Sequence, residues 1–150
     1  MVPRLIAGTF LNAIQRRKNW KDEYRFRGGW DYSKEGTEEF RRCLHDENYL
    51  AGIVYYGAFD GETLIGEIGF RPEQRHICFF FVKGSYHRKG IGTRLFQQLL
   101  RDDPNGTITL NSSPYGLPFY QALGFMSMDK EQTVNGIRFT PMKYGANRMR

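Results

Sequence analysis

The feature that most constrains the fold is a strand, a glycine turn, a helix and a second strand that follow one another along a single stretch of chain. The uninterrupted apolar run HICFFFV (76–82) is typical of a strand buried on both faces. Residues 91–101 carry apolar side chains at helical spacing, and the turn signal PNG (104–106) then precedes the strand-like TITL (107–110). This order predicts a βαβ unit, in which the two strands run parallel.

A β-hairpin is predicted immediately before this unit. AGIVYYGAF (51–59) and TLIGEIGF (63–70) are rich in β-branched and aromatic residues. Asp60-Gly61 lies between them, which is among the strongest short hairpin signals because glycine readily adopts the positive φ that such turns need. The sheet is therefore expected to be mixed, with antiparallel strands beside the parallel pair.

The remaining elements are expected at the two ends of the chain. They are an amphipathic helix over about 3–15, a loop over 16–32, a helix from Ser33 to about Leu44, a short helix at 118–123 that Gly124 stops, and strands near 125–128 and 137–144 joined through Asn135-Gly136. Because the helical pattern begins almost at Met1, a strand before it is expected to be absent or replaced by a few residues around Val2. If it is absent, the strand at 51–59 lies at an edge of the sheet or pairs with another chain. The whole chain, 1–150, is predicted to form one α/β domain.

Composition narrows the classes of protein and site. The chain has 150 residues, of which 40% are apolar, enough for a packed core. No apolar run approaches the ~20 residues that span a bilayer, and no signal peptide is recognisable, so a cytoplasmic location is expected. The two cysteines, Cys43 and Cys78, form no CxxC motif, and the three histidines lack ligand spacing, so neither a disulfide nor a metal site is expected.

The formal net charge of +6 leaves several kinds of partner open. Such a chain can bind nucleic acid, a membrane surface or a small anion, or can use the charge only for solubility. The basic segment 16–30 carries interleaved aromatic residues, a mixture that can stack single-stranded nucleic acid. Acidic residues interrupt it and no recognised nucleic-acid motif accompanies it, so nucleic-acid binding is the less favoured alternative.

The turn YHRKGIGTRL (86–95) has the features of a phosphate-binding site. The first N–H groups of a helix lack partners and carry the positive end of the helix dipole. Gly90 and Gly92 have no side chains there, so these N–H groups can close around an anion beside the cations at 88 and 89. The turn is neither a Rossmann fingerprint, whose third glycine would replace Leu95, nor a P-loop. Glycines in an ordinary strand-to-helix turn are the alternative explanation.

A second motif, NSSPYGLPFYQALGF (111–125), follows the next strand. Together the two motifs resemble the GCN5-related N-acetyltransferase (GNAT) family. Residues 87–92 follow the family's Gln/Arg-x-x-Gly-x-Gly/Ala turn, with His87 in place of the usual Gln or Arg, and residues 119–125 match its Phe-Tyr-x-x-Leu-Gly-Phe motif in full. The resemblance covers roughly residues 33–144. It implies a GNAT-like acyl-CoA N-acyltransferase fold, which usually begins with a strand, and acetyl-CoA as co-substrate without a metal.

The resemblance also implies roles for individual residues. Cofactor contacts would come from Phe80, Phe81 and Val82 beside the pantetheine arm, from His87, Arg88, Lys89, Gly90, Ile91, Gly92 and Thr93 around the diphosphate, and from Asn111, Ser113 and Phe119 near the arm. Tyr120 would give a proton to the departing thiolate. The base that accepts the amine proton would be His76 or Glu67, unless a chain of waters does this work. For each of these side chains a purely structural role is the alternative.

The sequence therefore predicts an N-acetyltransferase that moves the acetyl group directly to a primary amine of a small molecule or peptide. Cys43 and Cys78 are expected on a helix face and in a core strand, which does not suit a covalent acyl intermediate. The alternative is a non-catalytic acyl-CoA-binding module. The acceptor is not identified, although the aromatic residues of 20–32 are candidates to line its site, and a homodimer is left open.

Overall fold

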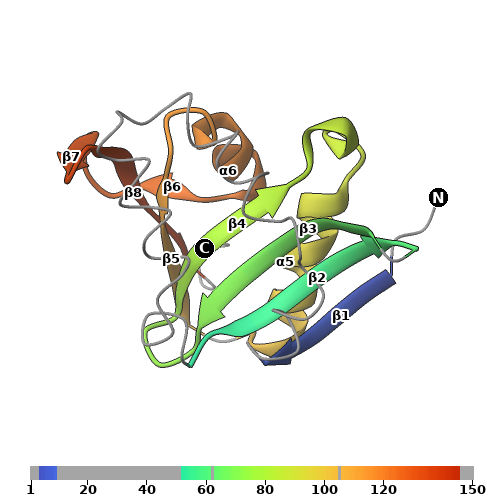
Figure 1. Ribbon diagram of the computed structural model, residues 1–150. Coiled ribbons are helices and arrows are strands. Elements are labelled where there is room, and N and C mark those ends of the chain that lie inside the picture. Colours follow the sequence, from blue (N-terminus) through green and yellow to red (C-terminus); the bar gives the residue numbers. More distant parts are fainter. Residues whose placement is uncertain (1–3, 10–51, 62, 105, 146–150) are drawn as a thin grey trace. The chain divides into compact units, whose positions relative to one another are not determined.

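The computed structural model describes residues 4–9, 52–61, 63–104 and 106–145. These residues fall into two compact units (Figure 1). The first combines residues 4–9 with 52–106, and the second comprises residues 107–145. The predicted loop over 16–32 and the predicted helix from Ser33 lie outside the described residues.

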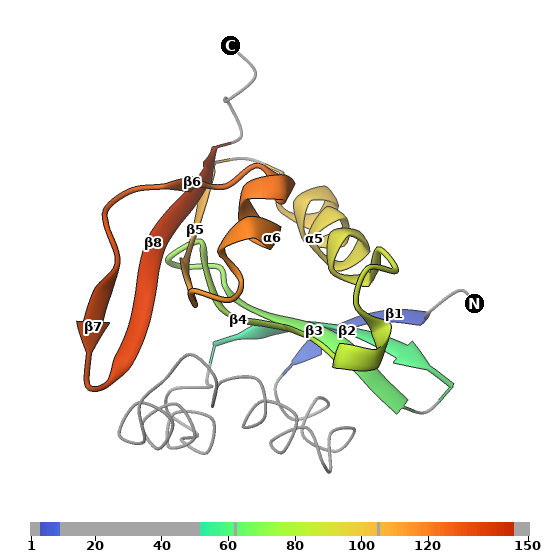
Figure 2. The same cartoon turned by 90° about the horizontal axis from the view of Figure 1, so that it is seen from above.

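The first unit is an antiparallel sheet covered on one face by a helix. Its elements are β1 (Arg4–Thr9), β2 (Val54–Asp60), β3 (Thr63–Arg71), β4 (His76–Val82), the 3-10 turn η1 (Gly84–Tyr86) and α5 (Ile91–Asp102). The strands pair in chain order, each antiparallel to the next. Figure 2 shows α5 lying across one face of these strands. The segment between β4 and α5 therefore starts at the end of a strand of this sheet and ends at the start of the helix that packs on it.

The prediction of a helix over 3–15 is wrong for the residues that the structure describes there. Arg4–Thr9 form β1, whose backbone pairs with β2 from Arg4 opposite Phe59 to Thr9 opposite Val54. Apolar spacing over so few residues fits either element, and pairing with a distant strand outweighs a weak local preference. The expectation that the first strand is missing is wrong for the same reason, and β2 is not an edge strand because it pairs on both sides.

The hairpin prediction is confirmed. β2 and β3 are joined through Asp60 and Gly61, and Gly61 has a φ of +62°, in the left-handed region that favours glycine. The expectation for 76–82 is right about the strand but wrong about its burial. Ile77, Phe79 and Phe81 are buried, whereas the residues between them are only half-buried. The apolar run therefore hides a normal alternation, because the second face also carries apolar residues.

Helix α5 packs unusually close to β3. An ideal Cβ on Gly66 would lie 3.1 Å from the carbonyl oxygen of Phe81 and 3.3 Å from side-chain atoms of both Ile91 and Leu95. The absence of a side chain at Gly66 thus lets the first turns of α5 approach the sheet. This contact sets the distance between the sheet and the first residue of α5, Ile91.

The second unit is built around one long strand. Its elements are β5 (Thr107–Ser112), α6 (Leu117–Leu123), β6 (Met126–Ser127), β7 (Gln132–Val134) and β8 (Ile137–Gly145). β8 pairs antiparallel with β5, β6 and β7. The predicted helix is confirmed, with a proline in its first turn and Gly124 after its end at a φ of +113°.

The late strands differ from prediction in one respect. Asn135-Gly136 does form a hairpin turn, but it joins β8 to β7, which the sequence did not predict, and not to the strand near 125–128. Three residues are too few for a recognisable alternation. The predicted parallel pairing of 76–82 with 107–110 would join the two units, and it stays a prediction, as does the single domain.

Candidate active site

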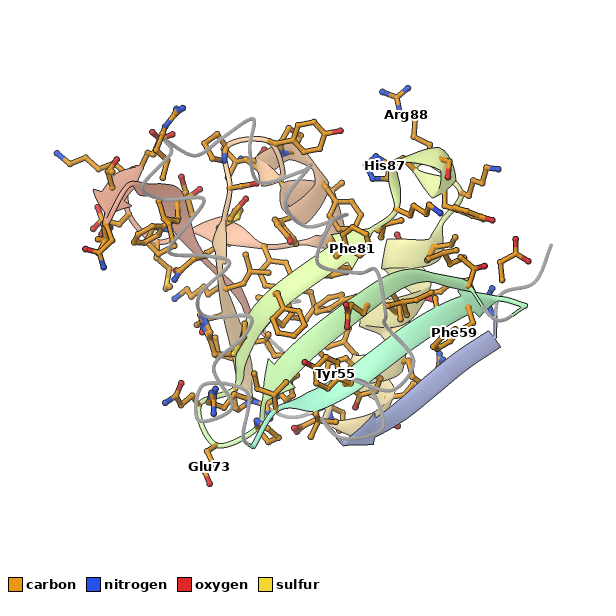
Figure 3. The ribbon with its side chains drawn as sticks, in the orientation of Figure 1. Tyr55, Phe59, Glu73, Phe81, His87 and Arg88 are labelled. Carbon is orange, nitrogen blue, oxygen red and sulfur yellow. The ribbon has the colours of Figure 1, made fainter. Side chains whose placement is uncertain are left out.

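The turn between η1 and α5 has a distinctive backbone. Arg88 and Gly90 both adopt left-handed conformations, with φ of +63° and +78°, and Gly90 directly precedes the first residue of α5. Left-handed residues that alternate with ordinary ones turn successive N–H groups toward the same side, which creates a concave site for anions. Figure 3 shows His87 and Arg88 at this turn. The predicted phosphate site thus has the backbone form that an anion requires.

The start of α5 is open. No side chain among the described residues caps it, and no residue of its first turn is acidic. The first backbone bond of the helix runs from the N–H of Arg94 to the carbonyl of Gly90, so the N–H groups of residues 91–93 have no acceptor within the helix. An ideal Cβ on Gly90 would meet no atom within 4 Å. Ile91 and Gly92 are buried, and Thr93 is exposed.

A second set of contacts links this turn to the β2–β3 hairpin. The hydroxyl of Tyr86 donates a hydrogen bond to Oδ2 of Asp60 at 2.6 Å. The ammonium of Lys89 lies over the ring of Tyr86, 5.5 Å from the ring centroid. Neither Asp60 nor Tyr86 was predicted as a site residue. The sequence signal at Asp60 is the Asp-Gly turn, which predicts the backbone of the hairpin but not the partner of the aspartate side chain.

His87, the residue that replaces the family's Gln or Arg, contacts the end of β4. Its Nε2 donates a hydrogen bond to the carbonyl oxygen of Val82 at 2.7 Å. This bond closes the loop of five residues that leads from the strand toward the helix. The structure thus gives His87 a bracing role, which does not depend on contact with a ligand.

The register of β3 and β4 decides which backbone groups of 80–82 could meet a ligand. The N–H of Lys83 donates to the carbonyl of Ile65 at 2.8 Å, and the next pairs along are Val82 with Gly66 and Phe81 with Glu67. Because hydrogen-bonded residues alternate in an antiparallel ladder, the backbone of Phe81 points toward β3. The backbone groups of Phe80 and Val82 point away from β3. A ligand beside β4 could reach those of Phe80 and the N–H of Val82, whereas the carbonyl of Val82 accepts the hydrogen bond from His87.

Glu67 lies on the sheet face opposite α5. Its neighbour Gly66 faces the helix, and successive residues of a strand point to opposite faces. The side chain of Glu67 is only 1% exposed, directly across from Phe81. Tyr55 and Phe59 are buried on the same face, and Figure 3 shows them with Phe81. The carboxylate therefore has an aromatic, poorly hydrated environment.

His76 lies at the other end of β4, opposite Arg71. Five residues separate it from Phe81, which corresponds to about 17 Å along a strand. Burial, and then the positive charge of Arg71, lower the pKa of His76 below its ordinary value of 6.5. The structure does not bring the two predicted base candidates together.

The ring of Tyr120 is packed between neighbouring aromatic side chains. Phe119 and Phe125 contact it edge-on, with centroid distances of 5.3 and 5.8 Å. An ideal Cβ on Gly116 would lie 3.0 Å from the Tyr120 ring, so the missing side chain makes room for it. The carbonyl of Tyr120 accepts the N–H of Phe125 at 3.0 Å. Tyr120 is half-buried with a fixed orientation, whereas Phe119 is 39% exposed.

Two predicted cofactor contacts, Asn111 and Ser113, lie in the second unit. Asn111 belongs to β5 itself, opposite Pro141, and is exposed. Ser113 holds the turn before α6, because its Oγ accepts the N–H of Gly116 at 3.1 Å. Neither observation tests a contact with a cofactor.

No cluster of potential metal ligands occurs among the described residues, and no helix in the described ranges is long and apolar enough to cross a membrane. Cys78, on β4, is half-buried and outside any disulfide, and its Sγ lies 4.0 Å from the carbonyl oxygen of His76. Cys43 lies outside the described residues.

The comparison with protein families gives one match. The family described as "Acetyltransferase (GNAT) domain" matches residues 30–146. No curated protein sequence matches the chain at a significant level.

Solved structures are similar over nearly the whole chain. A GCN5-related N-acetyltransferase from Rhodopseudomonas palustris has a TM-score of 0.76 at 19% identity, covering 97% of this chain and 96% of its own. The PaiA N-acetyltransferase from Thermoplasma acidophilum, solved with coenzyme A, has a TM-score of 0.70 at 20% identity, covering 97% and 99%. Tetrahymena GCN5 has a TM-score of 0.65 at 16% identity, covering 96% of each chain. These likenesses confirm the predicted fold.

Proposed function

Because the chain belongs to the GCN5-related N-acetyltransferase family, we propose that it transfers the acetyl group of acetyl-CoA directly to a primary amine. The observation that carries the proposal is the open, uncapped start of α5, where Gly90 leaves the backbone accessible and Arg88 and Lys89 add positive charge. A diphosphate fits such a site, because its charge meets both the helix dipole and the cations. The PaiA relative solved with coenzyme A supports the choice of cofactor.

Acetyl-CoA supplies the activated acyl group as a thioester. In our proposal its pantetheine arm lies beside β4, where the backbone groups of Phe80 and Val82 point away from β3. The amine nitrogen forms a bond to the acetyl carbon and loses one proton, while the bond from that carbon to sulfur breaks. The protein therefore has to accept a proton from the amine and provide one for the thiolate.

The position of Glu67 favours it over His76 as the residue that accepts the amine proton. Glu67 is directly opposite Phe81, within the stretch of β4 that would accompany the thioester. His76 is about 17 Å away along the same strand, which is too far for proton transfer without several waters. A carboxylate in an aromatic environment also favours an ammonium group beside it, which would draw the acceptor to the reacting carbon.

Tyr120 is the proposed donor of the proton for the thiolate. Its ring is fixed by Gly116, Phe119 and Phe125, so its hydroxyl has a defined direction. Because phenols are in general weaker acids than thiols, the proton transfer is most favourable while the bond to sulfur breaks and negative charge develops on the sulfur. The proposal takes the acceptor to be a small molecule or a peptide, and the location to be cytoplasmic.

The test uses three substitutions at two left-handed glycines. Gly90→Asp places a negative charge in the phosphate turn, Gly90→Asn adds a neutral side chain of the same size, and Gly61→Asp is the control in the β2–β3 turn. Asn and Asp tolerate left-handed backbone better than other residues, and an ideal Cβ meets nothing within 4 Å at either position. Release of free thiol from acetyl-CoA is followed over a panel of primary amines.

We expect Gly90→Asp to raise the KM for acetyl-CoA at least tenfold, Gly90→Asn to raise it less, and Gly61→Asp to leave it close to that of the native protein. Binding of acetyl-CoA without thiol release on any amine would favour a non-catalytic module. A KM that is equally insensitive to all three changes would contradict the proposed phosphate site.

A further inference from the structure

We propose that Asp60 and Tyr86 are positioning residues that hold the Lys89 ammonium at the phosphate turn while leaving its charge available for the cofactor's phosphates. The inference rests on the proposed binding of acetyl-CoA and adds a connection between that site and the β2–β3 hairpin. It concerns two residues outside the family's turn motif at 87–92: Tyr86 precedes the motif, and Asp60 lies far from it in sequence.

The geometry forms a continuous chain across three elements. Asp60 is the last residue of β2, Tyr86 ends η1, and Lys89 lies in the turn before α5. The Tyr86 hydroxyl donates to Asp60 at 2.6 Å, a short hydrogen bond of the kind that charged acceptors form. The Lys89 ammonium then lies 5.5 Å from the centre of the same ring, within the range of a cation–π interaction.

The first contact strengthens the second. Hydrogen bonding to an anion draws electron density from the hydroxyl toward the ring, and linked polar contacts polarise one another. The hydrogen bond to Asp60 also raises the pKa of the Tyr86 phenol above its ordinary value, which further favours the neutral, proton-donating form. A ring that is richer in electrons attracts the Lys89 ammonium more strongly than an isolated tyrosine would.

In the described part of the chain, Lys89 is held by an aromatic ring and not by a carboxylate, and this difference affects its ability to bind phosphate. Among the residues that the structure describes, Lys89 contacts the Tyr86 ring and forms no ion pair. At the other end of α5 the arrangement is different, because Arg75 pairs directly with Asp103 at 2.6 Å and its charge is largely compensated. A lysine held by a neutral ring keeps its charge for an incoming anion and loses less side-chain freedom when that anion binds.

The contact with Tyr86 also gives a second reason for an aspartate in the hairpin turn. A hairpin turn accounts for aspartate and glycine at these positions through their backbone preferences alone. The observed side chain of Asp60, however, reaches Tyr86 across 26 residues of sequence. The side chain of Asp60 therefore contacts the phosphate turn, in addition to the part its backbone has in joining the two strands.

The test compares two tyrosines that each donate to an aspartate. Tyr86→Phe removes the proposed link, and Tyr56→Phe is the matched control, because its hydroxyl donates to Oδ2 of Asp102 at 3.1 Å at the far end of α5. Binding of coenzyme A and of pantetheine, which lacks the phosphates, is measured by NMR chemical-shift titration, together with the midpoint of urea unfolding. Lys89→Met and the double variant with Tyr86→Phe complete the series.

We expect Tyr86→Phe to weaken coenzyme A binding about three- to tenfold and pantetheine binding by less than twofold, because only the phosphates meet Lys89. In the Lys89→Met background the same change should have almost no further effect. Tyr56→Phe should leave both affinities unchanged. Equal weakening of both ligands, or full additivity with Lys89→Met, would overturn the inference and leave only a structural role. Failure of the native protein to bind coenzyme A would instead overturn the proposed function.

Discussion

Replacing Gly66 by alanine is the sharpest test of how β3 positions the start of α5. The added methyl group would lie 3.1 Å from the carbonyl oxygen of Phe81 and 3.3 Å from atoms of Ile91 and Leu95. These separations are shorter than the ~3.5–4.0 Å at which non-bonded carbons are comfortable. The carbonyl belongs to the sheet ladder and both side chains are almost fully buried, so none of the three can move aside freely.

The expected magnitude follows from two opposing effects. Overpacking a close contact of this kind costs about 1–3 kcal/mol, whereas replacing glycine in a strand returns roughly 0.5–1 kcal/mol of backbone entropy. We therefore expect Gly66→Ala to lower the free energy of unfolding by about 1–2 kcal/mol. Since Ile91 is the first residue of the helix, its displacement should also weaken coenzyme A binding a few-fold.

Urea unfolding measures the first effect, and the slope should be unchanged because the surface exposed on unfolding is the same. Gly145→Ala, at the end of β8, is the control, since nothing lies within 4 Å of its ideal Cβ. It should be neutral or slightly stabilising. A Gly66→Ala protein as stable as the Gly145→Ala protein, with unchanged affinity for coenzyme A, would show that the close approach of α5 to β3 does not set the position of the turn.

Three further predictions concern the candidate acid and bases, Glu67, His76 and Tyr120. Glu67→Gln should lower kcat about a hundredfold with little change in the KM for acetyl-CoA, whereas His76→Gln should leave kcat within a factor of about three; the reverse result would make His76 the base. Burial and Arg71 hold the pKa of His76 below 6.5, so the unfolded chain takes up a proton first as the pH falls from 6.5, and the free energy of unfolding decreases over that interval. His76→Gln should make this decrease smaller, which urea unfolding at pH 7 and at pH 5 would measure. Tyr120→Phe should slow thiol release about ten- to a hundredfold at an unchanged KM for acetyl-CoA, and rates equal to those of the native protein would exclude Tyr120 as the acid.

Local signals account for the parts of the fold that the sequence predicted well. The β2–β3 hairpin needs only an Asp-Gly turn between two apolar runs, and α5 needs only apolar residues at helical spacing after a glycine. The error over residues 4–9 has a non-local cause. β1 exists because it pairs with β2, some fifty positions further along the chain, and no pattern within six residues reports that pairing.

The candidate site likewise has a part that local sequence predicts and a part that depends on contacts between distant elements. The glycine turn could be predicted because its chemistry lies in consecutive residues. The separation of Glu67 from His76 could not, because it depends on the register of β3 against β4, which places one candidate opposite Phe81 and the other opposite Arg71. The contact between Asp60 and Tyr86 was also hidden, since it joins side chains from two elements.

The backbone of Arg88 gives an independent reason to regard the turn as functional. Three described residues other than glycine have positive φ: Arg75, Arg88 and Asn135. Such a conformation costs an arginine about 1–2 kcal/mol. Asn135 precedes Gly136 in a hairpin turn that favours both, and Arg75 is held by its ion pair with Asp103 at 2.6 Å. Arg88 instead is exposed and, as Figure 3 shows, projects from the turn, so glycine would be the more stable residue there. An arginine at a position that suits glycine agrees with the phosphate site proposed above, where its charge beside the N–H groups of α5 would offset the lost stability when the anion binds.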